Sequence, residues 1–294
     1  MNGAGHIPNK FLGPIILTIA ASSWGSLYVV CKMVLTVIEP MTLVWIRMVS
    51  SAFLLGLMSK IMGESWHIER RDIPRLIAIG LVGYVFSNWA QFYGTQLASA
   101  QAGSVLTATS PVFMVIFAYF ILHEKITWKK WLSVCMSTVG VVLIVGVGGM
   151  QGGLFGGLIL IIAAATWGLI SVWVKQVPEK YPTIVVTMYC MIVSAVFLTP
   201  VELPVMNGQI MQAMLEPEVL AEITYIILVP TALAYYLWNK GLTMIDASTG
   251  GMYFFFQPVT GTFLGWLFLG ETIGLPFILG TLLILTGIVL VVRE

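Results

Sequence analysis

Charged side chains are scarce in this sequence. Only 9% of its 294 residues are charged, whereas a soluble globular domain carries about 25%. The formal net charge is +1, so the chain has no excess of basic residues that could form a broad face for nucleic acid. Because 59% of the residues are hydrophobic, the composition excludes an ordinary soluble domain and a nucleic-acid partner. It favours an integral membrane protein.

Residue types that bind metals or carry out catalysis are also few. The three cysteines fall in different apolar segments, and their spacing is not that of a disulfide framework or a metal site. The three histidines fall in the N-terminal tail, a loop and a predicted helix end, with no recurring ligand spacing. The motif Gly-x-x-x-x-Gly-Lys-Ser/Thr is absent, which excludes ATP as an energy source. We therefore expect no metal and no cofactor.

Long hydrophobic segments, by contrast, fill most of the chain. A helix of about 20 residues crosses the hydrocarbon core of a bilayer. Ten segments suited to this task lie near residues 11–34, 41–62, 74–96, 100–122, 129–147, 154–174, 183–202, 219–241, 247–269 and 276–292. The sequence therefore predicts an all-α integral membrane protein with ten transmembrane helices and no separate soluble domain.

The positions of the basic residues test this span count. If the N-terminus is cytoplasmic, twelve of the 14 Lys and Arg residues fall in inside loops and none falls in an outside loop. The other two, Lys32 and Arg47, lie within the first and second spans. Basic residues concentrate in cytoplasmic loops of membrane proteins, so the distribution predicts a multi-pass protein with both termini in the cytoplasm.

The second half of the chain repeats the first. At an offset of 147 residues the aligned pairs include Gly83 with Pro230, Pro111 with Pro258 and Glu124 with Glu271; at 143 residues Trp24 aligns with Trp167. The change of offset places a longer connection of the second copy between residues 204 and 222. Each copy holds five spans, an odd number, so the copies must be inverted, as in many secondary transporters. We therefore divide the chain into a first unit, 1–150, and a second, inverted unit, 151–294.

The motifs of each half resemble the EamA unit of the drug/metabolite transporter superfamily. The matching features are Trp-Gly on the first helix, Arg on the second, Pro-Val on the fourth, Glu at the end of the fourth and a Gly-rich fifth helix. They occur at Ser23–Gly25, Thr166–Gly168, Arg47, Ser110–Val112, Gln257–Val259, Leu122–Lys125, Leu269–Thr272, Gly140–Leu143 and Gly287–Leu290. Within the superfamily the chain is most similar to bacterial amino-acid and metabolite exporters of the YddG type. The second unit departs from the pattern, because Cys190 aligns with Arg47.

This resemblance implies a central cavity walled by the first, third and fourth helices of each unit, with the fifth helices at the periphery. It implies a transporter of the bacterial inner membrane, not an enzyme, that exports small metabolites by alternating access. Amino acids with aromatic or large apolar side chains are the expected substrates. No Asp or Glu lies in the middle of a predicted span, where ion-coupled pumps carry relay carboxylates, so we expect facilitated or weakly coupled transport. The expected partners are the substrate and the lipid bilayer, and we expect a functional monomer.

Polar and aromatic residues on spans three and eight define a candidate site. Tyr84, Asn88 and Gln91 recur at helical spacing on one face, and Tyr235 and Trp238 occupy the positions that align with the last two. Polar groups in hydrocarbon face a water-filled cavity or one another, so we interpret this face as cavity lining; the alternative is interhelical hydrogen bonding that only packs the bundle. The predicted cavity residues are Trp24, Tyr84, Asn88, Gln91, Trp167, Tyr235, Trp238, Asn239, Tyr253 and Gln257.

Four residues are predicted hinges. Pro111 and Pro258 each remove a backbone donor and free a carbonyl one turn earlier. Gly83 aligns with Pro230 and gives a second symmetric weak point. A rocking mechanism needs such bending points, although kinks of purely structural importance are the alternative.

Three charged residues lie within or at the ends of predicted spans. Arg47 could bind a substrate carboxylate, or it could cap helix-end carbonyls and hold the bundle together. We favour the structural role, because the second helices of the family are not the main cavity wall. Glu124 and Glu271 end the fourth helices at opposite membrane faces, where we expect them to accept hydrogen bonds from N–H groups of the next helix.

Two other functions compete with amino-acid export. An exporter of aromatic cations or drugs fits the aromatic residues, but no buried carboxylate matches a cation. A membrane-embedded enzyme would need a nucleophile, base or metal cluster near a membrane face, and the histidines supply none. Charge rings or carbonyl filters of a channel are also absent from the sequence.

Overall fold

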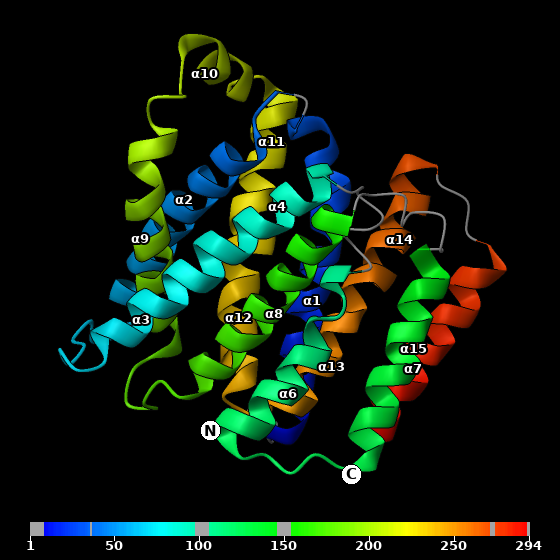
Figure 1. Cartoon of the computed structure of the whole chain (residues 1–294). Coiled ribbons are helices and arrows are strands. Elements are labelled where there is room, and N and C mark those ends of the chain that lie inside the picture. The colour runs from blue at the N-terminus through cyan, green and yellow to red at the C-terminus, as the bar shows by residue number, and fades with distance from the viewer. Residues whose placement is uncertain (1–8, 36, 98–105, 146–153, 271–273, 293–294) are drawn as a thin grey trace, which may run out of the picture.

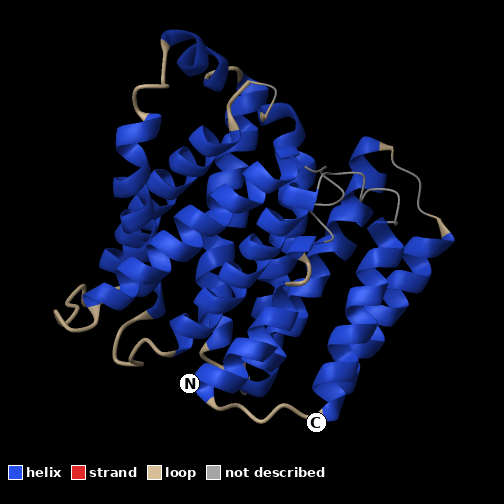
Figure 2. Cartoon of the chain, in the orientation of Figure 1, coloured by secondary structure: helices blue, strands red, loops and turns tan. Residues whose placement is uncertain are grey.

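The computed structural model describes residues 9–35, 37–97, 106–145, 154–270 and 274–292. Within these ranges the chain is helical and contains no strand (Figures 1 and 2). The helices of the first unit are α1 (Asn9–Val34), α2 (Pro40–Ile61), α3 (Ile73–Ile79), η1 (Gly80–Ser87), α4 (Asn88–Leu97), α6 (Ser110–Leu122) and α7 (Trp128–Val145). Those of the second are α8 (Leu154–Lys175), α9 (Thr183–Glu202), α10 (Gly208–Met214), α11 (Pro217–Ile226), η3 (Ile227–Leu233), α12 (Ala234–Leu242), α13 (Ala247–Met252), η4 (Tyr253–Phe255), α14 (Phe256–Leu269) and α15 (Leu275–Val292). The predicted all-α membrane fold is confirmed.

Five uninterrupted helical stretches are long and apolar enough to cross a membrane. They are Pro40–Ile61, Ile73–Gly94, Phe155–Lys175, Thr183–Glu202 and Pro217–Leu242. Shorter apolar helical stretches lie within other predicted spans, at Phe11–Leu27, Ser110–Leu122 and Leu275–Val291. Spans four and nine break just before their prolines, because proline cannot continue the hydrogen bonding of a helix. α6 begins at Ser110, and α14 begins at Phe256 after a 3₁₀ turn.

The connection between α9 and α11 contains a short helix that was not predicted from the sequence. This helix, α10, lies at one end of the molecule (Figure 1), within the connection that was predicted to be longer in the second unit. Asn207 caps it, because its side chain accepts a hydrogen bond of 3.0 Å from the backbone N–H of Ile210.

Both third helices contain a π-helical segment at equivalent positions. η1 and η3 begin 147 residues apart, the offset of the repeat. In η3, Pro230 cannot donate to the carbonyl of Ile226, and the Thr231 hydroxyl donates to that carbonyl instead, at 2.7 Å. In η1, Gly83 packs against Ile170, whose Cδ1 would lie only 2.6 Å from an added Cβ. The two segments therefore arise from different residues at the same place in the repeat.

The first helix of each unit packs against helices of the other unit. α1 of the first unit packs on α12 and α14 of the second, and α8 of the second packs on α4 and α6 of the first. The Trp-Gly motif permits this contact. A Cβ on Gly25 would lie 2.5 Å from the carbonyl oxygen of Gln257, and one on Gly168 would lie 2.9 Å from Cβ of Phe113. α7 and α15 pair with each other at the edge of the molecule (Figure 1), as the resemblance implied for the fifth helices.

Candidate functional site

Six aromatic rings meet where the first helices cross the third and fourth helices of both units. We call them the aromatic cluster: Trp24, Tyr84, Trp167, Tyr235, Trp238 and Phe254. The ring centroids of Trp24 and Trp167 are 5.2 Å apart, and those of Tyr84 and Tyr235 are 4.8 Å apart. Both pairs are edge-to-face, a favourable geometry for aromatic rings. The cluster therefore brings rings of both units into contact.

Five of the predicted cavity residues belong to this cluster, and Phe254 was missed. It lies in an aromatic run, Tyr253–Phe256, from which the sequence alone gives no means of choosing one ring. Tyr253 and Gln257 are buried beside it in the chain. Gln91 is half-buried on α4, about one turn beyond Asn88.

The three indole nitrogens of the cluster differ in their hydrogen bonds. Trp24 Nε1 donates to the carbonyl of Pro230 at 2.9 Å, and Trp238 Nε1 donates to Ser171 Oγ at 3.3 Å. Trp167 Nε1 is buried and has no acceptor within the described ranges. Buried polar groups normally have a partner, so the aligned residues Trp24 and Trp167 are not equivalent.

Two asparagines of the predicted site flank Tyr84. Asn239 Nδ2 donates to the Tyr84 hydroxyl and to Thr187 Oγ1, at 2.9 Å each. Asn88 Nδ2 donates to the backbone carbonyl of Tyr84 at 3.0 Å. These bonds connect polar groups of both units beneath the aromatic rings.

Arg47 joins this network. Its side chain is 4% exposed, and its Nη2 donates to Asn88 Oδ1 at 2.8 Å and to the Tyr235 hydroxyl at 3.4 Å. Its Nε is buried without a hydrogen-bond partner in the part of the chain that is described. The ion pairs among the described residues do not include it. Arg47 was expected to cap helix-end carbonyls and hold the bundle together, with binding of a substrate carboxylate as the alternative. Its described bonds go to side chains of the predicted site and join helices of both units. The choice between the two roles stays a prediction.

The four predicted hinges all coincide with irregular helix geometry. Gly83 and Pro230 lie inside η1 and η3. Pro111 and Pro258 lie in the first turn of α6 and α14, just after each fourth helix is interrupted. The Ser110 hydroxyl donates to the Thr107 carbonyl at 2.7 Å, so the carbonyl that Pro111 frees is satisfied. Bending at these points remains a prediction.

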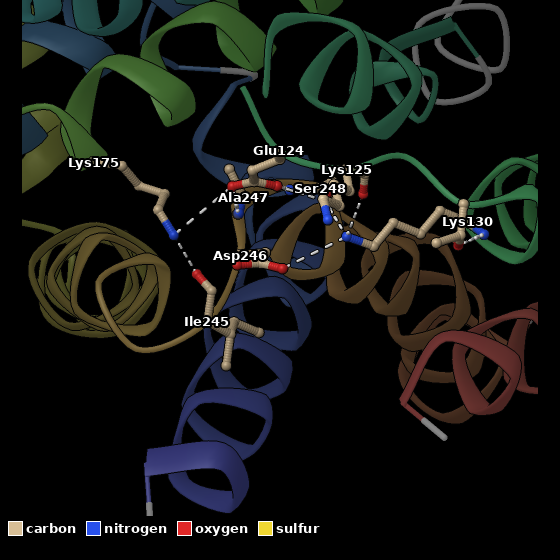
Figure 3. Close-up of polar contacts among 9 residues, drawn as sticks. Glu124, Lys125, Lys130, Lys175, Ile245, Asp246, Ala247 and Ser248 are labelled. Atoms are coloured by element: carbon tan, nitrogen blue, oxygen red, sulfur yellow. Dashed lines mark hydrogen bonds and ion pairs between the residues drawn. The ribbon is translucent and has the colours of Figure 1, made fainter. Parts of the chain in front are cut away.

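Figure 3 shows a second polar cluster, where α6 ends and α13 begins. This end of the molecule carries the basic loops (Figure 1), and we call it the basic face. Glu124, which follows α6, accepts hydrogen bonds from the backbone N–H groups of Ala247 and Ser248, at 2.7 and 3.0 Å, and from the Ser248 hydroxyl at 2.5 Å. Glu124 was expected to bond N–H groups of the next helix. It bonds the first residues of α13 instead, which belong to the other unit. Glu271 lies outside the described residues.

Two lysines complete this basic-face cluster. Lys175 Nζ donates to the Ile245 carbonyl at 2.5 Å and lies 4.0 Å from Glu124 Oε1. Lys130 Nζ donates to Ser248 Oγ at 2.8 Å and lies 3.6 Å from Asp246. The sticks of Figure 3 converge from α6, α7, α8 and the α12–α13 turn. The cluster therefore ties the two units together with opposite charges in contact.

Loops of the two units also touch elsewhere on the basic face. Lys180 forms an ion pair with Glu69, and the Tyr181 hydroxyl donates to Asp72 Oδ2 at 2.7 Å. The hydrogen bond from Lys180 holds the pKa of Glu69 below its ordinary value and raises the pKa of Lys180. A pocket of about 410 Å³ opens beside these loops and is lined by Arg71, Asp72, Pro74, Arg75, Ala78, Trp173 and Gln176.

No group of three or more His, Cys, Asp or Glu side chains that could hold a metal occurs in the described ranges.

The sequence model of the EamA-like transporter family matches residues 11–146 and 154–293. The chain belongs to the EamA-like transporter family. The two matched stretches agree with the two copies seen in the sequence.

The similar proteins are transporters from bacteria and archaea. The uncharacterized transporter YoaV of Bacillus subtilis is 28% identical over 94% of this chain and 94% of its own length. An uncharacterized transporter of Archaeoglobus fulgidus is 23% identical over 95% and 98%. A solved crystal structure has the same fold, with a TM-score of 0.81, 18% identity and coverage of 95% of this chain and 96% of that one.

Proposed function

We propose that this EamA-family transporter exports amino acids with aromatic or large apolar side chains from the bacterial cytoplasm. The observation that carries the proposal is the aromatic cluster, because rings from both units meet at the interface that a substrate has to cross. A large apolar side chain can replace ring–ring contacts with ring–substrate contacts of similar energy. The polar residues Asn88 and Asn239 beneath the rings can bond its polar end.

A relative supports this substrate class. A protein of Streptantibioticus cattleyicolor named "probable terminal-alkyne amino-acid exporter" is 25% identical over 228 residues, which cover 76% of this chain and 74% of its own. The name concerns that protein. For this chain it favours amino acids over the other small metabolites that the family could carry.

The two clusters fit an alternating-access cycle. The basic face is the cytoplasmic side by the positive-inside rule, because the sequence places twelve Lys and Arg residues in inside loops and none in outside loops. Contacts of Glu124 and Lys175 hold that side closed across the two units, so admission of substrate from the cytoplasm requires them to part. Bending at Gly83, Pro111, Pro230 and Pro258 would allow the units to rock in the inner membrane. The protein acts as a monomer, and transport is facilitated or weakly coupled.

The alternative, an exporter of aromatic cations or drugs, is favoured by one observation. Faces of Trp and Tyr rings attract ammonium groups, and the cluster contains five such residues. Arg47 argues against it, because a buried positive charge that contacts Tyr235 repels a cationic substrate in the same space.

Counterflow into proteoliposomes of the full-length protein separates the two functions. Vesicles loaded with phenylalanine are diluted into labelled phenylalanine with or without competitors. We expect leucine and tryptophan to compete and tetraalkylammonium ions to have no effect. Competition by tetraalkylammonium but not by leucine would contradict the proposal. Steep accumulation driven by a pH gradient would contradict facilitated transport.

A further inference from the structure

We propose that Arg47 is the anion-binding residue of the transport site and holds the carboxylate of the amino acid. This inference rests on the proposed function and gives it a chemical basis. Arg47 is 4% exposed, carries a permanent charge and contacts only neutral partners among the described residues, Asn88 and Tyr235.

A buried guanidinium without a counter-charge is costly. Desolvation of an ion is compensated only when an opposite charge and enough hydrogen bonds replace water, and the cost is greater inside a bilayer. Asn88 and Tyr235 accept hydrogen bonds from Nη2, while Nε has no acceptor among the described residues. A carboxylate supplies both missing elements, a negative charge and acceptor oxygens in the geometry that a guanidinium prefers.

The position of Arg47 fits a substrate that is charged at one end and apolar at the other. Tyr235 accepts its hydrogen bond and also packs edge-on against the rings of Trp24, Tyr84 and Trp167. A carboxylate bound at Arg47 therefore places the rest of an amino acid beside the aromatic cluster. Trp167 Nε1, a buried donor without a partner in the described ranges, belongs to the same group of rings.

The second unit offers no copy of this anchor. Cys190 occupies the position equivalent to Arg47 and is fully buried on α9, with its Sγ 3.7 Å from the Leu76 carbonyl. A neutral thiol provides no anion site. The inverted repeat therefore builds one carboxylate site and not two, which predicts one amino acid per transport cycle.

The test compares substrates that differ only at the carboxylate. Purified full-length protein in proteoliposomes is assayed with phenylalanine, phenylalaninamide and phenethylamine as competitors of labelled phenylalanine counterflow, with direct uptake of labelled phenylalaninamide in parallel. For the wild type we expect phenylalanine to compete best. Arg47→Gln should weaken the affinity for phenylalanine about 10- to 100-fold, so that phenylalanine no longer competes better than phenylalaninamide. Cys190→Ala, the matched control in the other unit, should keep the wild-type order.

Arg47→Lys provides the same decision if Arg47→Gln does not fold. It retains the charge but loses the fork geometry, so we expect an intermediate loss for phenylalanine and no loss for the amide. Unchanged preference for phenylalanine in either variant would overturn the anchor while leaving amino-acid export intact. If the wild type transports carboxylates other than amino acids and Arg47→Gln loses this transport, the proposed function is overturned and the role of Arg47 as anion-binding residue is retained. Wild-type transport of amines alone would overturn both.

Discussion

The interior cluster around Arg47 and the basic-face cluster around Glu124 both join the two units, yet they differ in how completely their polar groups are satisfied. Glu124 accepts three hydrogen bonds and has Lys175 nearby, and Lys130 lies between Ser248 and Asp246. In the interior, the Arg47 guanidinium has neutral partners and one nitrogen without any in the described ranges.

This difference separates a region whose charges are paired across the units from a region that we propose as the substrate site. Charges that are paired within the chain stabilise one arrangement of the units. A buried charge with no counter-charge among the described residues can gain one from a bound anion, as we propose for Arg47. Both clusters were formed by the same inverted repeat, so the distinction comes from individual residues and not from the fold.

The largest effect on stability is expected at the basic face. Glu124→Gln removes the charge that three donors and Lys175 share, and we expect the free energy of unfolding in mixed micelles to fall by about 2 to 3 kcal/mol. Amide hydrogen exchange at Ala247 and Ser248 should accelerate. Lys125→Gln is the control, because Lys125 contributes its backbone carbonyl to the cluster. Equal stability of the two variants would show that the cluster does not hold the units together.

A matched pair of tryptophans compares a satisfied with an unsatisfied donor inside the aromatic cluster. Trp24→Phe and Trp167→Phe remove similar ring area, but only Trp24 loses a described hydrogen bond, to Pro230. We expect Trp24→Phe to be about 1 kcal/mol less stable than Trp167→Phe in thermal or chemical unfolding. Transport should respond in the other direction, with a larger rise in KM for Trp167→Phe. A reversal of either order would contradict the assignment of Trp167 as a free donor.

The hydrogen bond from Thr231 to the Ile226 carbonyl in η3 tests a single satisfied backbone group, and its expected effect on stability is smaller than that of Glu124. Thr231→Val should cost about 1 kcal/mol, because the Thr231 hydroxyl serves the Ile226 carbonyl that Pro230 cannot reach. In a Pro230→Ala background the new N–H can serve that carbonyl, so the same change should cost less. A double-mutant cycle measures this coupling. Strictly additive costs would exclude the compensation.

The smallest effect concerns pH at the exposed loops of the basic face. Lys180 lowers the pKa of Glu69, so their pair adds stability above the ordinary pKa of a Glu side chain. That stability is lost as the pH falls through the lowered pKa. The unfolding midpoint of the wild type should be slightly higher than that of Glu69→Gln at neutral pH. The difference between the two midpoints should disappear in acid and in high salt. A gap that widens in acid would have the wrong sign.

Hydropathy and the basic residues predicted the span count, because a bilayer imposes one helix length and one charge asymmetry. They could not reveal which polar atoms meet. The bonds of Arg47 to Asn88 and Tyr235 could not be derived from the sequence, and Glu124 was expected to bond the next helix, although it bonds α13. Such contacts depend on the crossing of α1 and α8 between units, which no local pattern encodes. Phe254 was not among the predicted cavity residues, because nothing in the run Tyr253–Phe256 distinguishes its ring from its neighbours.

Ligand-dependent stability tests the central claim most directly. Phenylalanine is titrated into wild type, Arg47→Gln and Glu124→Gln in detergent while the unfolding midpoint is recorded, since a ligand that binds the folded state raises it. We expect a concentration-dependent rise for wild type and for Glu124→Gln, and for Arg47→Gln a rise only at phenylalanine concentrations about 10- to 100-fold higher. A rise in Arg47→Gln equal to that of the wild type would contradict the assignment of the interior cluster as the site for the substrate carboxylate.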